Sequence, residues 1–509
     1  MFLYFWVMKN LSNTTDNTQI LIGLTSIIIL IRIIFIFFMG PMPQDAYYFL
    51  YSQHPSLSYF DHPAGIAVIL RFFTSVFGNN TIAIKLADSV TTLGTVWVFY
   101  LLAQKFYKKE EAKKALLLLL STLMVSILSL ISTPDSPLLF FWALSLLMLH
   151  VAIFEDKKWF WVLTGIAMGL AFDSKYTAVF LPSGMILFLL LSNSKRKYLA
   201  TIWPYLVCIL FVLVAMPVIV WNIDNHFASF VFQGKERMQS VSSFHLTPRF
   251  FFGLVGTQLF LLIPILFLSL FYGLWKIYKI YGHFWNKLPS SLLFLLCFFL
   301  PVFVVFIVLS PIYWIKINWL MPSYIAGIIF VTSYVSAKWL KWQVVISVVL
   351  HVAMAIEIIF YVVPVRSDDT WFGWKDLATQ TQEVEKQHGA NFIFSADGYK
   401  TSAELSLFCN QFIYGQNVIG NPALQFDYIG TDLKALNGKT AIFIDSEPRF
   451  SDLNKAPIVP EKLSGYFKRV QQLEPILIYN SGKVVRKFNV FLCEDYHFVP
   501  PNGEIINIP

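Results

Sequence analysis

The chain has few charged residues, which fill 13% of its 509 positions, whereas a soluble globular domain carries about 25%. Hydrophobic residues fill 57% of the positions, and aromatic residues alone fill 17%. This balance excludes a soluble globule and predicts a membrane protein.

The sequence also lacks compact functional motifs. It contains no CxxC and no HExxH, and its polar C-terminal region has neither a GxGxxG nor a P-loop pattern. Two of the four cysteines, Cys208 and Cys297, lie within apolar runs and are expected to pack in the core. Cys409 and Cys493 lie in the C-terminal region, and their spacing leaves open whether they form a disulfide.

Apolar runs of about 20 residues recur through the first 364 positions, and each is long enough to cross a bilayer as a helix. We therefore expect an α-helical polytopic membrane protein with about 11–13 transmembrane helices. The expected spans are 19–39, 81–103, 115–133, 136–154, 159–173, 176–192, 199–221, 250–275, 289–310, 317–336 and 343–364, with a shorter amphipathic segment at 64–77. No small-residue cleavage site follows the first span, so we expect it to be retained.

Basic residues gather in alternate loops, which the positive-inside rule places in the cytoplasm. These loops carry Lys105, Lys108, Lys109, Lys113, Lys114, Lys157, Lys158, Lys195, Arg196, Lys197, Lys276, Lys279, Lys287, Lys338 and Lys341. The net charge of +8 is thus mainly a signal of topology, and we expect no nucleic-acid partner. The other polar loops and the C-terminal region then face outward.

The composition changes near Pro364, which predicts a transmembrane domain over residues 1–364 and an extracytoplasmic domain over 365–509. Within the second domain, 376–389 has the pattern of an amphipathic helix, and 392–394, 441–444 and 476–479 have that of short strands. Alternating strands and helices predict a small α/β domain.

The segment 43–70, directly after the first span, carries Asp45, Asp61, His62 and several tyrosines. Ionisable groups this close to the hydrocarbon are costly unless water, a metal or a substrate meets them. We therefore favour a reaction at the membrane surface. The alternative is that Asp61, His62 and Pro63 form a capped and solvated turn.

Several motifs occur in a fixed order along residues 19–340. They are QDAYYF at 44–49, YFDHPA at 59–64, TPDSPLLFFW at 133–142, SKYTA at 174–178, Trp221-Asn222, and KINW at 316–319. With these motifs the chain resembles the GT-C class of integral-membrane glycosyltransferases, in particular the bacterial group related to protein O-mannosyltransferases and to the aminoarabinose transferase of lipid A. One position departs from the pattern, because Gln44 stands where that group has the first of two adjacent acids.

The resemblance implies an inverting transfer of a sugar from a polyprenyl-phosphate donor to an envelope acceptor at the bacterial inner membrane, with the site and the C-terminal domain facing the periplasm. Lipid A or another glycolipid is the expected acceptor, and protein hydroxyls are the alternative. A transporter of lipid-linked sugars is a further alternative, but such proteins usually contain internal repeats and bind near the bilayer midplane. Here no repeat is visible and the ionisable residues gather at one face.

The candidate general bases are Asp45 and Asp61, because a carboxylate can take the proton of an acceptor hydroxyl. Lys175, Lys316, Arg237 and Tyr176 are candidates for the donor phosphate, with Lys235 and Arg249 as further outward cations. The candidates for contact with the sugar or acceptor are Tyr47, Tyr48, His62, Asp135, Asn222, His226, Gln233 and Asn318.

Simpler interpretations exist for several of these residues. Asp135 could cap the helix that follows it, and Lys175 could extend its amine to the interface as an ordinary snorkelling lysine. Lys235, Arg237 and Arg249 could belong to a solvated loop. We expect no obligatory metal or cofactor, and a divalent cation held by Asp61 with His62 and His226 is the weaker alternative.

Overall fold

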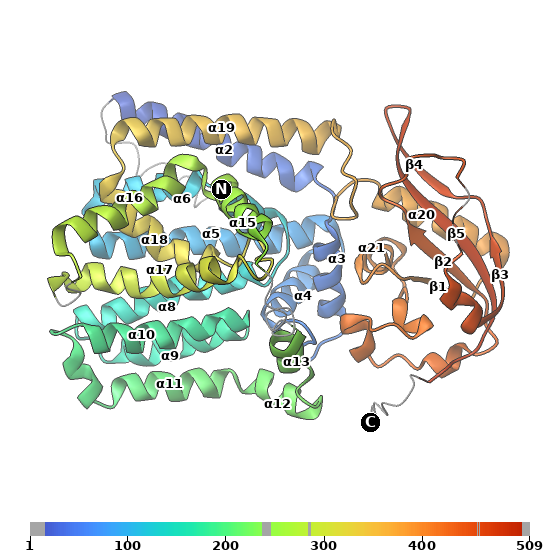
Figure 1. Ribbon diagram of the computed structural model, residues 1–509, viewed down its shortest axis with the longest axis horizontal. Helices are drawn as coiled ribbons and strands as arrows, with labels where there is room; N and C mark the ends of the chain where they lie inside the picture. The colour runs from blue at the N-terminus through green and yellow to red at the C-terminus, as the bar shows by residue number, and fades with distance from the viewer. Residues whose placement is uncertain (1–15, 237–245, 284–286, 456, 458, 501–509) are drawn as a thin grey trace. The chain divides into compact units, whose positions relative to one another are not determined.

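The computed structural model describes residues 16–236, 246–283, 287–455, 457 and 459–500, and these residues form two compact units (Figure 1). Unit 1 consists of Met1–Phe37, His62–Ile66 and Lys85–Ala355, and unit 2 consists of Phe38–Asp61, Ala67–Ile84 and Ile356–Pro509. The segment after the first helix therefore groups with the C-terminal region. The sequence-based division into 1–364 and 365–509 stays a prediction.

Unit 1 is a bundle of apolar helices. The helices that lie wholly or mainly in it are α2 (Asp16–Phe38), α5 (Thr81–Phe106), α6 (Lys109–Leu120), α7 (Leu123–Leu130), α8 (Asp135–Phe154), α9 (Trp159–Phe172), α10 (Phe180–Leu191), α11 (Trp203–Val214), α12 (Met216–Asp224), α13 (Ala228–Val231), α15 (Pro248–Leu262), α16 (Pro264–Tyr281), α17 (Ser290–Leu309), α18 (Met321–Val331) and α19 (Ala337–Phe360). Short turns of other helix types are η1 (Tyr176–Val179), η2 (Arg196–Ala200), η3 (Phe232–Glu236) and η5 (Thr332–Tyr334).

Within the described residues, five helices are long and apolar enough to cross a membrane, or up to eight if each bent helix pair is one span. Four shorter apolar helical segments accompany them: Gly65–Phe77, Trp159–Phe172, Tyr176–Leu191 and Met321–Tyr334. The predicted class, an α-helical multi-pass membrane protein with a small C-terminal sheet domain, is confirmed.

Three expected spans are broken rather than continuous. The bends are 62° between α6 and α7, 46° between α11 and α12, and 108° between α15 and α16. The expectation of one helix over 250–275 is therefore wrong, and the cause is Pro264. A proline lacks an N–H and disfavours helical geometry in the residue before it. Ile263, which precedes Pro264, is indeed not helical and has a φ of 67°.

Side chains from α19 and α2 bind the backbone groups that these breaks release. Gln343 accepts from the Leu266 N–H at 3.1 Å and donates to the Leu262 carbonyl at 2.9 Å. Arg32 donates to the carbonyls of Leu120 (2.9 Å) and Thr122 (2.8 Å). Because hydrocarbon offers no partner to a free backbone group, these contacts make the bends compatible with a membrane.

Small residues allow close helix packing in unit 1. Helix α9 carries Gly165 and Gly169 on the face that contacts α11. A Cβ at Gly165 would lie 2.7 Å from Leu210, and one at Gly169 would lie 2.5 Å from Val214, which is too close in both cases. This GxxxG spacing is typical of tightly packed membrane helices.

Unit 2 contains a five-stranded sheet. Its strands are β1 (Phe392–Ser395), β2 (Ala441–Ser446), β3 (Phe467–Gln472), β4 (Ile476–Asn480) and β5 (Lys483–Tyr496). The order is β1-β2-β5-β3, with β4 also paired to β5, and only β1 and β2 run parallel. The other elements of unit 2 are α3 (Pro43–Gln53), most of α4 (Gly65–Phe77), α20 (Trp374–His388), α21 (Lys400–Cys409), η6 (Gln416–Ile419), η7 (Leu424–Tyr428), η8 (Leu433–Leu436) and η9 (Glu461–Gly465).

Both faces of this sheet are covered by apolar side chains. One core gathers around Trp374 and Ile442, and the other around Phe394 and Phe443. The helix expected at 376–389 and the three expected strands are confirmed as α20, β1, β2 and β4. The thiols of Cys409 and Cys493 are both buried and free, so the structure contains no disulfide between them.

Candidate active site

Several of the candidate residues form two clusters, one in each unit. In unit 2, Asp61 is half-buried and receives hydrogen bonds from two tyrosines of α3. The Tyr47 hydroxyl lies 3.3 Å from Asp61 Oδ1, and the Tyr51 hydroxyl donates to the same oxygen. Residues four apart share a helix face, which is why both hydroxyls reach one carboxylate. We call Asp61, Tyr47 and Tyr51 the Asp61 cluster.

The C-terminal region supplies the surroundings of this cluster. The Gln425 N–H donates to the Tyr47 hydroxyl at 3.2 Å, and the Gln425 side chain accepts from the Phe60 N–H at 2.8 Å. The Tyr399 ring stacks on Tyr47 with centroids 4.3 Å apart. Sequence reasoning missed Tyr399 and Gln425, because nothing in their local sequence indicates contact with a segment more than 300 residues away.

The environment keeps these phenols protonated. Burial, followed by the negative charge of Asp61, raises the pKa of Tyr47 well above its ordinary value. Burial also raises the pKa of Tyr399, and the charge of Asp369 adds to this shift. Each hydroxyl therefore remains a neutral hydrogen-bond donor throughout the physiological pH range.

The structure gives Asp45 a local role. Its carboxylate is fully buried, and Oδ2 accepts from the Met42 N–H at 2.7 Å, at the N-terminus of α3. An acid in the first turn suits the positive end of a helix. The Tyr48 ring is buried beside Tyr47 and Tyr51, with centroid distances of 5.6 and 5.3 Å.

The residue that departs from the family pattern, Gln44, has an acidic neighbour. Its amide donates to Asp369 Oδ1 at 3.2 Å, while Lys400 binds Asp369 Oδ2 at 2.9 Å. An acid at position 44 would face the Asp369 carboxylate. The glutamine is thus compatible with Asp369 where a carboxylate would be repelled.

In unit 1, Asp135, Lys175 and Asn318 form a buried polar cluster, which we call the Asp135 cluster. The Lys175 amine lies 2.8 Å from both Asp135 oxygens, and Asn318 donates to Oδ2 at 2.5 Å. Only 1% of the Asp135 side chain and 7% of the Lys175 side chain are exposed. Three of the motifs noted in the sequence, at 133–142, 174–178 and 316–319, therefore meet here.

Two simpler interpretations of these residues are wrong. Asp135 is not the N-cap of α8, because that position belongs to Pro134 and Asp135 is the first helical residue. Lys175 does not snorkel to the interface, because its amine is buried against Asp135.

Two buried ionisable residues of α5 support the loop before Asp135, and sequence reasoning missed both. Asp88 accepts from the Ser132 hydroxyl at 2.6 Å, and the Lys85 amine donates to the Leu130 carbonyl. Their presence inside an apolar span was the available signal, since such residues are rarely without a role.

A second connection in unit 1 joins two motifs. The Gly65 N–H donates to the Asp173 carbonyl at 2.8 Å, which brings the segment that begins at His62 beside the loop that carries Lys175. A Cβ at Gly65 would lie 2.9 Å from the Ser174 Cα, so this close approach requires glycine. His62 itself is half-buried.

Tyr176 and Asn222 organise the loop after α12. The Tyr176 hydroxyl lies 2.5 Å from the Ser229 hydroxyl, and the Asn222 side chain accepts from the Phe230 N–H at 3.1 Å. His226 is exposed in the turn between Asn222 and Phe230, with a φ of 53°. Gln233 is half-buried in η3.

The remaining candidates are less informative. Lys316 and Arg249 are exposed. Arg237 and the side chain of Lys235 lie outside the described residues. Among the residues that are described, no three His, Cys, Asp or Glu side chains are grouped closely enough to hold a metal ion.

Comparison with solved structures identifies the fold as that of GT-C membrane glycosyltransferases. The apo structure of ArnT from Cupriavidus metallidurans superposes with a TM-score of 0.61 at 12% identity, covering 94% of this chain and 98% of that one. The same protein bound to undecaprenyl phosphate also gives 0.61, covering 93% and 98%. An apo oligosaccharyltransferase from Archaeoglobus fulgidus gives 0.52 at 12% identity, covering 84% and 70%.

Sequence comparisons agree with this class. A family model described as dolichyl-phosphate-mannose-protein mannosyltransferase matches residues 61–221. The lipid A galacturonosyltransferase RgtD of Rhizobium johnstonii is 25% identical over 307 residues, which cover 58% of this chain. The match spans 61% of that relative's length. The resemblance to GT-C glycosyltransferases that the motifs indicate is confirmed.

Proposed function

We propose that the chain is an inverting glycosyltransferase that moves a sugar from a polyprenyl-phosphate donor to lipid A or another envelope glycolipid. The observation that carries this proposal is the ArnT fold, which extends over 94% of the chain. Two similar proteins support the proposed acceptor and donor. RgtD is a lipid A galacturonosyltransferase, and an ArnT structure contains undecaprenyl phosphate.

In the proposed reaction, an acceptor hydroxyl attacks the anomeric carbon on the face opposite the lipid phosphate. The bond from that carbon to the phosphate oxygen breaks, and its electron pair leaves with the phosphate. Asp61 takes the proton of the attacking hydroxyl as general base. Asp61 suits this role because it is half-buried and accepts hydrogen bonds from two phenols, which orient its carboxylate.

Asp45 is the alternative base. Its full burial and its bond to the Met42 N–H favour a role in holding α3 instead. Tyr47 and Tyr48 are consecutive residues of this helix. We assign their side chains to contact with the sugar beside Asp61.

Cations are needed where the phosphate departs, because preorganised positive charge stabilises a developing anion. Two of the three N–H donors of Lys175 face Asp135, which leaves the third for a phosphate oxygen. Lys316 is exposed in the loop that also supplies Asn318, and Tyr176 and Arg237 are the further proposed phosphate contacts. We assign His62, Asp135, Asn222, His226, Gln233 and Asn318 to the surroundings of the sugar or acceptor.

We place this reaction at the periplasmic face of the inner membrane, because the basic loops are expected in the cytoplasm. Ser194→Cys and Ser451→Cys test the topology, since both positions are exposed. An impermeant thiol reagent added to intact spheroplasts should label position 451 and not position 194. The unsubstituted chain is the control for its own cysteines, and the reverse pattern would contradict the orientation.

A protein acceptor is the second candidate, favoured by the description of the matching family model. Mass spectrometry of lipid A and of envelope glycoproteins from a gene-deletion strain separates the two. We expect lipid A to lose one sugar mass, to regain it with the wild-type gene and not to regain it with Asp61→Asn. Loss of a protein glycan with unchanged lipid A would instead establish the protein acceptor. Intact lipid A and intact glycoproteins would contradict both.

A further inference from the structure

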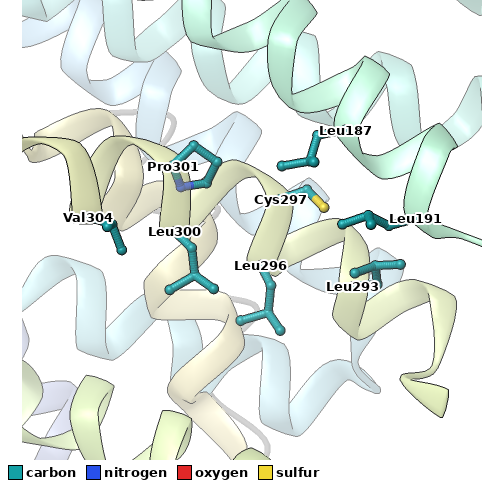
Figure 2. Close-up of a pocket in the computed structure, with 8 residues that line it drawn as sticks. All are labelled: Leu187, Leu191, Leu293, Leu296, Cys297, Leu300, Pro301 and Val304. Atoms are coloured by element: carbon teal, nitrogen blue, oxygen red, sulfur yellow. The ribbon is translucent and has the colours of Figure 1, made fainter. Parts of the chain in front are cut away.

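Two apolar grooves flank the N-terminal half of α17 in unit 1. The first has a volume of about 310 Å³ and lies between α10 and α17 (Figure 2). The second, of about 280 Å³, lies between α16 and α17. Leu296 and Leu300 contribute to both, so the two grooves run side by side with a shared wall.

Figure 2 shows the residues that line the first groove. Leu187 and Leu191 extend from α10 toward the side of α17 that carries Cys297 and Pro301, while Leu296 and Leu300 point to the other side of the helix. The first groove extends from Leu293 to Val304, a rise of roughly 16 Å at 1.5 Å per residue. That is about half the thickness of the bilayer hydrocarbon, or the depth of one leaflet.

Both grooves reach the same end of the bundle, where α10 and α16 end and α17 begins. This end, which we call the groove mouth, is polar. The Ser290 hydroxyl lies 2.8 Å from that of Ser194 and 3.2 Å from that of Ser192. Beside Leu191, the Arg196 guanidinium donates to the Leu190 carbonyl through Nε (3.0 Å) and Nη2 (2.6 Å).

The groove mouth is also positively charged. Exposed Arg196 follows α10, exposed Lys279 lies in the last turn of α16, and exposed Lys287 directly precedes Leu288 of the second groove. The stretches 187–203 and 271–304 contain no acidic residue. The two acids of the loop after α8 have partners of their own, because Glu155 pairs with Lys105 and Lys157, and Asp156 accepts from Tyr198.

We propose that the paired grooves hold the two acyl chains of an anionic phospholipid, with its phosphate at the groove mouth between Arg196 and Lys287. Two grooves with one wall suit two chains of one molecule, and their depth suits a lipid of one leaflet. Basic pockets between membrane helices at the cytoplasmic side are suited to anionic headgroups.

The donor lipid is a poorer occupant. It has one chain, and its phosphate belongs near Lys175, which precedes the N-terminal end of the helical segment Tyr176–Leu191. The groove mouth lies at the C-terminal end of that segment. The two lipids would therefore enter from opposite ends.

Native mass spectrometry of the full-length protein in mild detergent tests this site. The protein is titrated with dioleoyl phosphatidylglycerol and, separately, with the zwitterionic dioleoyl phosphatidylcholine. We expect phosphatidylglycerol to bind more tightly, and Arg196→Gln with Lys287→Gln to weaken it about thirtyfold, since each basic residue contributes about fivefold. Lys108→Gln with Lys109→Gln, two exposed lysines that line neither groove, is the matched control and should leave binding unchanged.

A second pair of variants tests the groove itself. Val304→Trp fills the first groove and should abolish the phosphatidylglycerol adduct, whereas Val308→Trp, one turn further on α17 and outside both grooves, should not. Equal binding of the two phospholipids, or no effect of the double charge variant, would overturn the proposal. Displacement of phosphatidylglycerol by undecaprenyl phosphate, blocked by Val304→Trp, would assign the groove to the donor chain instead. If Val304→Trp does not fold, the surface charge variants still decide.

Discussion

Asp135 and Asp61 are both aspartates of family-like motifs, yet the protein surrounds them in opposite ways. Asp135 is 1% exposed and bound by a lysine amine at 2.8 Å and an asparagine amide. Asp61 is half-buried and accepts from the hydroxyls of Tyr47 and Tyr51. One carboxylate is paired with an opposite charge, and the other accepts hydrogen bonds from two phenols.

This difference separates a structural charge from a reactive one. A buried ion pair must stay complete, because removal of one partner leaves an uncompensated charge in a medium of low dielectric. Asp61 is half-buried, so its carboxylate can also meet a substrate. We therefore expect changes in the Asp135 cluster to affect folding first, and changes in the Asp61 cluster to affect turnover first.

The largest effect is expected for Lys175→Met. It should lower the free energy of unfolding by about 3–5 kcal/mol, because Asp135 would remain buried without its cation. Yield after membrane extraction and the thermal unfolding temperature in detergent measure this loss.

The control for this variant is Lys175→Met combined with Asp135→Leu, which removes both charges. The double variant should recover much of the stability while remaining inactive, since apolar replacement of a whole buried pair is often tolerated. A single variant as stable as wild type, with weakened donor binding alone, would instead make Lys175 a phosphate ligand with no structural role.

The second effect is expected for Asp61→Asn. The change keeps an oxygen that can accept the tyrosine hydroxyls, so the unfolding temperature should stay close to wild type. Turnover should fall about a hundredfold or more, the scale for loss of a general base. A sugar-transfer assay with the purified protein in nanodiscs measures this.

Asp45→Asn is the matched control, because Asp45 is the other candidate base and sits on the same segment. We expect its main effect on stability, through the bond to the Met42 N–H. If Asp45→Asn abolishes turnover and Asp61→Asn does not, the assignment of the base is reversed.

The sequence predicts the apolar helices well because their runs are long, and α2, α8 and α17 follow the expected spans closely. It predicts the helix breaks poorly. Pro264 is a readable signal for the bend between α15 and α16, but the bend between α6 and α7 falls within LSTL at 120–123, which contains no proline. That bend depends on Arg32, whose partners Leu120 and Thr122 are distant in sequence.

The same limit applies to the candidate site. Asp135, Lys175 and Asn318 each stood out as polar residues in apolar surroundings, but no local pattern could pair them. Tyr51 could have been predicted as a partner of Asp61, because it lies four residues after Tyr47 on one helix. Strand β5 escaped notice because charged residues at both its ends, such as Lys483 and Glu494, hide a strongly apolar centre.

A smaller effect is expected from the pH dependence of unit 2. Burial raises the pKa of Asp445 to about 6, and the charges of Asp397, Glu447 and Asp368 add to this shift, while Asn489 opposes it. Because the folded pKa lies above the unfolded value, the neutral carboxyl stabilises the fold at low pH, and this contribution is lost as the pH rises from about 4 to about 6.

Asp445→Asn should remove that loss, which is on the order of 1 kcal/mol once solvent screening at a partly exposed site is allowed for. Hydrogen exchange of β2 amides in the full-length protein at pH 4.5 and 7.5 measures it, after correction for intrinsic exchange rates. Asp427 also has a pKa raised to about 6 by burial, so part of the pH dependence should remain in the variant. An unchanged pH dependence would mean that the titration of Asp445 does not cause the loss of stability.

The smallest effect is expected for Gln44→Glu, which restores the acid of the family pattern. The new carboxylate would face Asp369, whose oxygen accepts from the Gln44 amide at 3.2 Å. Lys400 compensates one charge at this position but not two. Like charges at a partly exposed site cost about 0.2–1 kcal/mol, so the variant should unfold at a slightly lower temperature.

Asp369→Asn in the same chain should reverse the loss, and the double-mutant cycle isolates the coupling between the two positions. If Gln44→Glu is neutral in both backgrounds, Asp369 does not explain the glutamine. If it raises turnover while Asp61→Asn still abolishes it, position 44 assists the base.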